Sequence, residues 1–347
     1  MKIAVIGLRD AAIKEPFKWG TEKFIYELCT HLARKWHKID LYCSPGSDVP
    51  WVSIIENQVA DVFGFYDDNY ELITLIDKYY YEEISYKVAA ADYDLVLDSS
   101  FRDGFLHYVH KLSVPVIKVH HVPVYKDVRR TIELEQQFVW KVQHVFVSEF
   151  QKNTSWIIRN THVIHNGIDT SIWKPSDKVW DYMVWFGRID ESKWAKYAVQ
   201  AALHMKKKLI LIGSKFDEAY FAKYVEPYIW EYVEHKWPLS HAELCTIVAQ
   251  AQCFLYTSVW DEPFGYVTAE ALAAWVPVAA FNKWAINEIV TDKVGSITSD
   301  ISTEWLTQAI QEALIKDRAA CREHALKNFS IEKMLDEYEE LMREIVK

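Results

Sequence analysis

Residues 253–273, with the sequence CFLYTSVWDEPFGYVTAEALA, decide the fold. The apolar residues at the start of this stretch predict a buried strand, and the residues from Tyr266 onward predict a helix. Pro263 and Gly265 keep Glu262 out of a regular helix, whereas Glu270 is expected about one turn into the helix. In an α/β fold with a parallel sheet, ligands bind where a strand ends and the next helix begins. A ligand site is therefore expected at this junction.

The start of the predicted helix is a candidate anion site. The first amides of a helix and the positive end of its dipole favour an anion such as phosphate. Gly265 and Tyr266 stand at this start, directly after Phe264. On local sequence alone, solvated or capping carboxylates are the better interpretation of an isolated pair such as Glu262 and Glu270.

Short apolar runs recur along the whole chain and lack polar alternation, which is typical of strands covered on both faces. They occupy residues 2–6, 39–43, 95–97, 114–119, 144–147, 162–164, 182–186, 208–212, 253–256 and 276–281. Helical periodicity separates them, so the chain is expected to be α/β with parallel sheets. The pattern runs once from Met1 and again from about Tyr182, with a polar linker at 166–181. This predicts two domains, 1–165 and 166–330, followed by an amphipathic helix at 331–347 with Ser330 as its N-cap.

Composition and charge exclude several classes of protein. The chain has 347 residues, half of them apolar and a quarter charged, which suits about two ordinary globular domains. Its net charge of −10 disfavours nucleic acid as a partner, because binding there depends on neutralising phosphates.

The predicted location is the cytoplasm. The five cysteines are odd in number and lack C-x-x-C spacing, which favours reduced core thiols. The apolar start is too short for a signal peptide. The longest apolar run, 271–281, is interrupted by Pro277 and is too short to span a bilayer, so any membrane contact would be peripheral.

A second candidate element follows the run 182–186, where Gly187 and Arg188 precede Lys193. Arginine binds phosphate through two hydrogen bonds and lysine adds a point charge, so the two could neutralise a diphosphate without a metal ion. A surface pair among Asp190 and Glu191 is about equally consistent with the local sequence.

Two further candidates lie in the first predicted domain. Gly20 stands at the start of a helix, where it would let a ligand approach the backbone. His120 follows an apolar strand beside His121, although a histidine at such a place is more often a packing or surface residue. No metal site is expected, because the sequence has no H-E-x-x-H motif and the Asp-x-Asp at 92–94 precedes its strand, at the edge opposite the expected site. A Walker lysine loop and a G-x-G-x-x-G motif are also absent.

Taken in order, these segments resemble the retaining nucleotide-sugar glycosyltransferases of family 4, which have the GT-B fold of two facing Rossmann-like domains. The resemblance spans nearly the whole chain. It is carried by Val147-Ser148, Asn166-Gly167-Ile168-Asp169, Gly187-Arg188 with Lys193, Glu262-Pro263-Phe264-Gly265 with Glu270, and Phe329-Ser330-Ile331-Glu332. It implies that the last helix crosses back onto the first domain.

The resemblance also implies roles for the candidate residues. The second domain would hold a nucleotide-diphosphate sugar, with Arg188 and Lys193 on the diphosphate and Glu270 on the ribose. Glu262 would contact the transferred sugar, and His120, or His121 in its place, would lie near it. The acceptor hydroxyl compound would bind the first domain, and no cofactor or metal is implied.

Some positions depart from the family pattern. Trp19, Trp194 and Trp275 stand where the family usually has glycine, and glycine is scarce overall at 10 of 347 residues. These departures bear on the acceptor pocket and the choice of sugar.

Two other functions stay open at this point: a nucleotide-sugar epimerase on the same fold, and a non-catalytic sugar-nucleotide binding subunit. A lipid-linked acceptor is a further option, because the first domain mixes basic and aromatic residues that could rest on an anionic membrane: Lys14, Phe17, Lys18, Trp19, Lys23, Arg34, Lys35, Trp36 and Lys38. A solvated helix face explains the same residues.

Overall fold

The computed structural model describes residues 1–346 apart from 16, 18–19, 58–69, 102–103, 125–128, 136, 138–140, 158 and 238. Lys18 and Trp19, named above, therefore lie outside the described residues. The chain divides into two compact units, Met1–His165 with Met334–Lys347, and Asn166–Lys333. Each unit is described by itself below.

The first unit is built on a parallel sheet. Among the described residues it has seven strands in the order β3-β2-β1-β4-β5-β6-β7. Their bounds are β1 Lys2–Ile6, β2 Lys38–Cys43, β3 Ser53–Glu56, β4 Leu95–Asp98, β5 Val116–His120, β6 Val142–Phe146 and β7 Thr161–Val163. β1 is fully covered from Ile3 to Ile6, which explains why its sequence shows no polar alternation.

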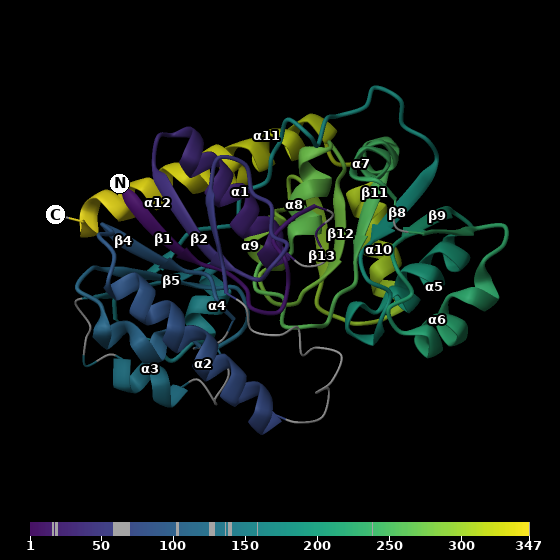
Figure 1. The fold of residues 1–347 in the computed structure, drawn as a ribbon. Helices are drawn as coiled ribbons and strands as arrows, with labels where there is room; N and C mark the ends of the chain where they lie inside the picture. Colours follow the sequence, from purple (N-terminus) through teal and green to yellow (C-terminus); the bar gives the residue numbers. More distant parts are fainter. Residues whose placement is uncertain are drawn as a thin grey trace. The chain divides into compact units, whose positions relative to one another are not determined.

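Helices cover both faces of this sheet. The helices are α1 Gly20–Arg34, α2 Tyr70–Ala89, α3 Arg129–Glu135, α4 Glu149–Thr154 and the 3₁₀ helix η1 Leu106–Lys111. α1 and the C-terminal helix α12, Ile331–Ile345, lie on one face, while α2 and α3 lie on the other (Figure 1). The predicted stripe of α12 is confirmed, since Met334, Tyr338 and Met342 are buried, and the ring of Tyr338 meets that of Phe24 on α1. The hydroxyl of Ser330 accepts a hydrogen bond from the amide of Lys333, as predicted for the N-cap.

The second unit has the same design. Its described strands form a parallel sheet of six in the order β10-β9-β8-β11-β12-β13. They are β8 Tyr182–Phe186, β9 Lys208–Ile212, β10 Val233–Lys236, β11 Cys253–Tyr256, β12 Val278–Phe281 and β13 Gly295–Thr298.

The helices of the second unit again cover both faces. One face carries α5 Ala195–Met205, α6 Glu218–Tyr224 and α10 Thr303–Ala313, whose apolar residues share one core with β8, β9 and β11. The other elements are α7 His241–Gln250, α8 Tyr266–Ala273, α9 Ile286–Ile289, α11 Arg318–Phe329 and the 3₁₀ helices η3 Glu191–Lys193 and η4 Glu226–Tyr228. The strand from 253 to 256 and the helix from Tyr266 are as predicted.

The strand order fixes where a ligand can bind in the second unit. The chain winds outward from β8 in one direction through β9 and in the other through β11, so β8 and β11 flank the switch point of the sheet. The backbone is close there, because a Cβ on Gly213, after β9, would lie 1.8 Å from the carbonyl oxygen of Gly187, after β8. Only glycine fits at that approach.

The structure bears on two predictions about the protein's environment, reduced core cysteines and the lack of a membrane-spanning helix. All five cysteines are free and buried, as expected of core thiols. Within the described part of the chain, no helix combines the length and the apolar composition that a membrane crossing needs. The predicted α/β class with two parallel Rossmann-like sheets is confirmed.

Candidate active site

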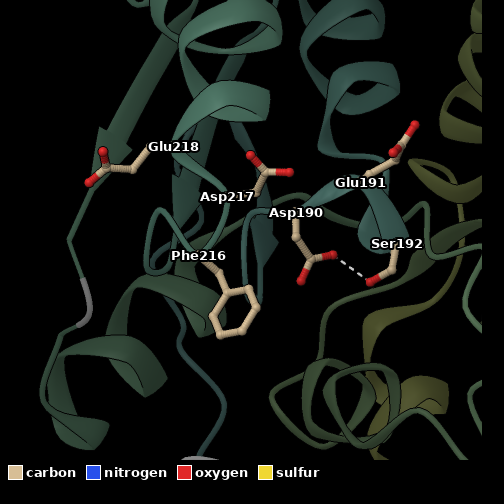
Figure 2. Close-up of a pocket in the computed structure, with 6 residues that line it drawn as sticks. All are labelled: Asp190, Glu191, Ser192, Phe216, Asp217 and Glu218. Carbon is tan, nitrogen blue, oxygen red and sulfur yellow. Dashed lines mark hydrogen bonds between the residues drawn. The ribbon is translucent and has the colours of Figure 1, made fainter. Parts of the chain in front are cut away.

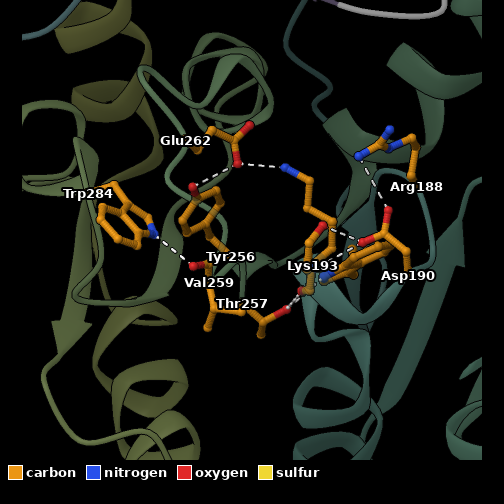
Figure 3. Close-up of polar contacts among 10 residues, drawn as sticks. Arg188, Asp190, Lys193, Tyr256, Thr257, Val259, Glu262 and Trp284 are labelled. Atoms are coloured by element: carbon orange, nitrogen blue, oxygen red, sulfur yellow. Dashed lines mark hydrogen bonds and ion pairs between the residues drawn. The ribbon is translucent and has the colours of Figure 1, made fainter. Parts of the chain in front are cut away.

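Asp190 organises the loop that follows β8. Its side chain accepts hydrogen bonds from the amide of Lys193, at 3.2 Å, and from the hydroxyl of Ser192, so it is the N-cap of η3. The same carboxylate lies 3.4 Å from the guanidinium of Arg188. One residue therefore positions both cations that the sequence singled out (Figure 3).

Lys193 and Glu262 form an ion pair between the ends of β8 and β11. The ammonium of Lys193 lies 2.7 Å from Glu262 Oε2, and the hydroxyl of Tyr256 donates to the same oxygen at 3.0 Å (Figure 3). Burial acts to raise the pKa of Glu262, but Lys193 and Tyr256 outweigh it, so the pKa lies below its ordinary value. Burial, and then Glu262, raise the pKa of Tyr256 well above its ordinary value. Glu262 is thus ionised at neutral pH and Tyr256 is a hydrogen-bond donor.

The loops after β8 and β11 are also joined through the backbone. The hydroxyl of Thr257 donates to the carbonyl of Lys193 at 2.8 Å, and the indole of Trp185 donates to the same hydroxyl at 3.0 Å. These contacts hold the backbone of Lys193 against the end of β11. The ion pair between Lys193 and Glu262 therefore joins two loops that are already fixed to each other.

The N-terminus of α8 lies directly after Glu262. Gly265 is its N-cap, with φ of 94°, a conformation that favours glycine. Tyr266 begins the helix and Glu270 is buried within it. The ring of Phe264 is buried against the rings of Tyr266, the first residue of α8, and Phe329. The residues predicted for the second domain are therefore gathered around the ends of β8 and β11.

An acidic pocket of about 560 Å³ adjoins this cluster (Figure 2). It is lined by Asp190, Glu191, Ser192, Phe216, Asp217 and Glu218. The guanidinium of Arg188 lies 4.6 Å from the ring centre of Phe216, at the side of the pocket. Carboxylates repel phosphate but accept hydrogen bonds from hydroxyl groups, so a diphosphate fits the Arg188 and Lys193 side of Asp190 better than this pocket.

The two candidates of the first unit have different surroundings. Gly20 is exposed and begins α1. His120 is the last residue of β5 and is buried, not in the loop after the strand as the sequence suggested. Its Nε2 lies 3.1 Å from Nδ1 of His144, whose Nε2 lies 3.1 Å from the carboxylate of Glu135. Burial, His144 and Lys118 lower the pKa of His120 well below its ordinary value, so it is neutral. Its catalytic role stays a prediction.

His121, the alternative histidine, packs differently. Its ring meets that of Phe24 at 4.6 Å, and burial followed by the charge of Lys118 lowers its pKa to about 3. In the described part of the structure, its Nε2 is buried without a hydrogen-bond partner. Among the same residues, no group of three or more His, Cys, Asp or Glu could hold a metal ion.

The sequence did not identify Asp190 and Tyr256 as members of the site. An aspartate three residues before Lys193 is a capping signal that could have found the first. The second is the last residue of β11 and reads only as an apolar strand residue, so no local signal marks it.

Asp190 can be tested through stability. Asp190→Ala should lower the free energy of unfolding by about 1 kcal/mol, because the cap of η3 is lost. Asp190→Asn keeps the capping oxygen and should cost much less. Urea unfolding of both variants measures this, and equal losses would show that the cap is not what Asp190 contributes.

Part of the chain matches a family of known proteins. Residues 175–328 match the family model described as "Glycosyl transferases group 1". The chain is 29% identical over 193 residues to alpha-maltose-1-phosphate synthase of Mycobacterium tuberculosis, an alignment covering 47% of this chain and 49% of that protein. The chain therefore spans about half the length of the curated relatives it matches.

Solved structures match over almost the whole chain. Sucrose-phosphate synthase of Thermosynechococcus elongatus has a TM-score of 0.80 at 17% identity, covering 99% of this chain and 98% of that one. The Anabaena protein Alr3699/HepE in complex with UDP-glucose has a TM-score of 0.74 at 15% identity, covering 99% and 100%. The fold is therefore that of the GT-B glycosyltransferases, and residues 175–328 carry the match to the group 1 family.

Proposed function

We propose that the protein transfers a sugar from a nucleoside-diphosphate sugar to a hydroxyl acceptor, with retention of anomeric configuration and without an obligatory metal ion. The observation that carries this proposal is the cluster of Arg188, Lys193 and Glu262 at the switch point of the second sheet, beside the N-terminus of α8. Two cations and a helix N-terminus on one edge suit a diphosphate leaving group.

The leaving group is the part of the reaction that the cations act on. As the bond to the sugar breaks, negative charge grows on the diphosphate, and Arg188 and Lys193 stabilise that charge. The amides at Gly265 and Tyr266 contribute in the same way at the helix start. The diphosphate oxygen that is released can accept the acceptor's proton on the same face of the sugar, which gives retention.

Carboxylates bind the uncharged parts of the donor, the ribose and the transferred sugar. Glu270 holds the ribose hydroxyls, and Glu262 accepts hydrogen bonds from the hydroxyls of the transferred sugar. Glu262 pairs with Lys193 in the structure, so donor binding would replace part of this ion pair with contacts from Lys193 to phosphate.

Relatives support the donor class. The Anabaena protein was solved with UDP-glucose, and the mycobacterial relative is named as a synthase of a sugar phosphate. From these relatives we carry over to this protein only the class of donor, a nucleotide sugar.

The acceptor is assigned to the first unit, where neutral His120 could accept or donate one hydrogen bond to a sugar hydroxyl. We place the reaction in a reducing compartment, the cytoplasm, because all five cysteines are free. A lipid-linked acceptor has weaker support, since Lys35 pairs with Asp336 and Glu339 and adds little positive charge to a membrane-facing surface.

The proposal is tested by release of nucleoside diphosphate from a panel of nucleotide sugars, with and without acceptor and with a chelator. Arg188→Ala should slow release about tenfold to a hundredfold, because a charged hydrogen bond is worth roughly 1.5 to 3 kcal/mol. Lys208→Ala, at the opposite end of the second sheet, is the matched control and should leave the rate unchanged.

Other outcomes separate the alternatives. Conversion of the donor sugar without acceptor would indicate an epimerase, and tight donor binding without turnover would indicate a binding subunit. An unchanged rate for Arg188→Ala in an active protein would reject the assignment of the site.

A further inference from the structure

Tryptophan occupies an unusual set of backbone positions. Among the described residues, seven that are not glycine have positive φ, and five of these are tryptophan: Trp36 at 68°, Trp51 at 62°, Trp194 at 48°, Trp275 at 69° and Trp284 at 57°. A side chain makes this left-handed conformation unfavourable, and its few regular occupants are Asn, Asp and His. The other two residues are Asn160 and Lys206. Nothing in the chemistry of an indole favours this conformation.

Two of the five stand at the helix end where glycine is most favoured. The amide of Trp36 bonds to the carbonyl of Ala33 and that of His37 to Leu32, which makes Trp36 the left-handed residue of a Schellman motif after α1. Trp275 has the same position after α8. Its amide donates to the carbonyl of Leu272, and the amide of Val276 donates to the carbonyl of Ala271.

The other three tryptophans occupy turns in which the backbone also has positive φ. Trp51 follows Pro50, the order of proline and then positive φ that a type II turn has, with glycine or asparagine in the second place. Trp194 separates η3 from α5 in a left-handed conformation. Trp284 lies in the turn between β12 and α9.

The side chains of Trp36 and Trp51 are mostly exposed, so burial does not compensate for the backbone conformation there. Trp36 is 93% exposed and Trp51 is 67% exposed. By contrast, Trp173 and Trp185 are 1% and 3% exposed and are absent from the positive-φ set. Burial therefore explains tryptophan at positions such as 173 and 185, but it does not explain tryptophan at the positive-φ positions 36 and 51.

We propose that glycine occupies positions 36, 51, 194, 275 and 284 in the protein as its own cell makes it, because the codon read as tryptophan there is read as glycine in that cell. The opal triplet UGA has this property, since some genetic codes assign it to tryptophan and others to glycine. This also accounts for part of the scarcity of glycine, 10 of 347 residues against a usual value of about 7%.

The substitution changes the candidate site, and this consequence rests on the proposed function. Trp194 directly follows Lys193, and its indole lies against Tyr197. The indole of Trp284 donates to the carbonyl of Val259, in the loop that leads to Glu262 (Figure 3). With glycine at both positions, the backbone beside Lys193 and the Glu262 loop is open to a donor.

The codons of the gene give the first test. UGA is expected at all five positions, and UGG at Trp173 and Trp185. UGG at the five left-handed positions would overturn the proposal, whatever the protein's activity.

The second test measures the stability of the protein that carries tryptophan at the five positions. Trp36→Gly and Trp36→Ala remove the same exposed side chain, but only glycine adopts positive φ freely. We expect the glycine variant to melt about 2–4 °C above the alanine variant. Leu326→Gly and Leu326→Ala, at a half-exposed position within α11, are the matched control and should show the opposite order.

The outcomes separate the two proposals. Equal melting temperatures for the two Trp36 variants would contradict the backbone argument. If the codons and the melting order are as expected but Trp194→Gly with Trp284→Gly leaves UDP binding unchanged, only the consequence for the donor site fails.

Discussion

Replacing Lys193 with methionine should slow sugar transfer about tenfold to a hundredfold and reverse the way this site's stability depends on pH. The rate falls because the leaving diphosphate loses a charged hydrogen bond worth roughly 1.5 to 3 kcal/mol. The substitution keeps an unbranched side chain of similar length, so the change isolates the charge.

The pH effect follows from Glu262. In the native protein its pKa lies below the ordinary value, so the ion pair contributes stability above the unfolded pKa of about 4.3, and this is lost as pH falls through the lowered value. Without Lys193, burial is the main influence and raises the pKa of Glu262. Stability is then greatest below about pH 4 and falls as the pH rises through the raised value.

Melting temperatures of both proteins across the acid range measure this reversal. The difference between them should be smallest below the lowered pKa of Glu262 and should grow as the pH rises toward neutral. Glu262→Gln with and without Lys193→Met is the control pair, because neither protein has the titrating carboxylate and the difference between them should not depend on pH. A constant difference across the range would mean that Glu262 does not depend on Lys193.

The sequence was most informative about strands in the middle of a sheet. β8 and β11 are covered on both faces, and their apolar runs predicted them correctly. The edge strands β3 and β10 were not predicted, because they are partly exposed and carry polar residues, here in SIIE and VEHK, whereas the edge strand β7 was predicted by its apolar run. β13 was not predicted either, since its pairing with β12 leaves no room for a Cβ at Gly295, 2.3 Å from the carbonyl of Val278.

The site could be predicted only as far as spacing along the chain reaches. Arg188 with Lys193, and Glu262 with Glu270, are each close in sequence and follow a strand, so local pattern found them. The ion pair from Lys193 to Glu262 and the contact of Tyr256 depend on β8 and β11 being neighbours in the sheet. That neighbourhood comes from the winding of the whole unit, and no local pattern encodes it.

The largest expected loss of stability is in the first unit, where Lys118→Met should cost about 3–5 kcal/mol. Lys118 and Asp98 form an ion pair at 3.1 Å with 1% and 0% of their side chains exposed. The ammonium also donates to the carbonyl of Ser100 at 2.7 Å. The variant leaves the Asp98 carboxylate buried without a counter-charge, and this accounts for most of the expected loss.

A second variant distinguishes an unpaired charge from poor packing. Lys118→Met with Asp98→Asn buries no charge and should recover most of the stability, because replacing both members of a buried pair is often nearly neutral. Urea unfolding of the three proteins gives the comparison. If the double variant is as unstable as the single one, the ion pair's charge is not the cause. In that case the loss of stability comes from the hydrogen bonds that the Lys118 ammonium donates to Ser100. These bonds hold β5, which ends at His120, against the carboxyl end of β4.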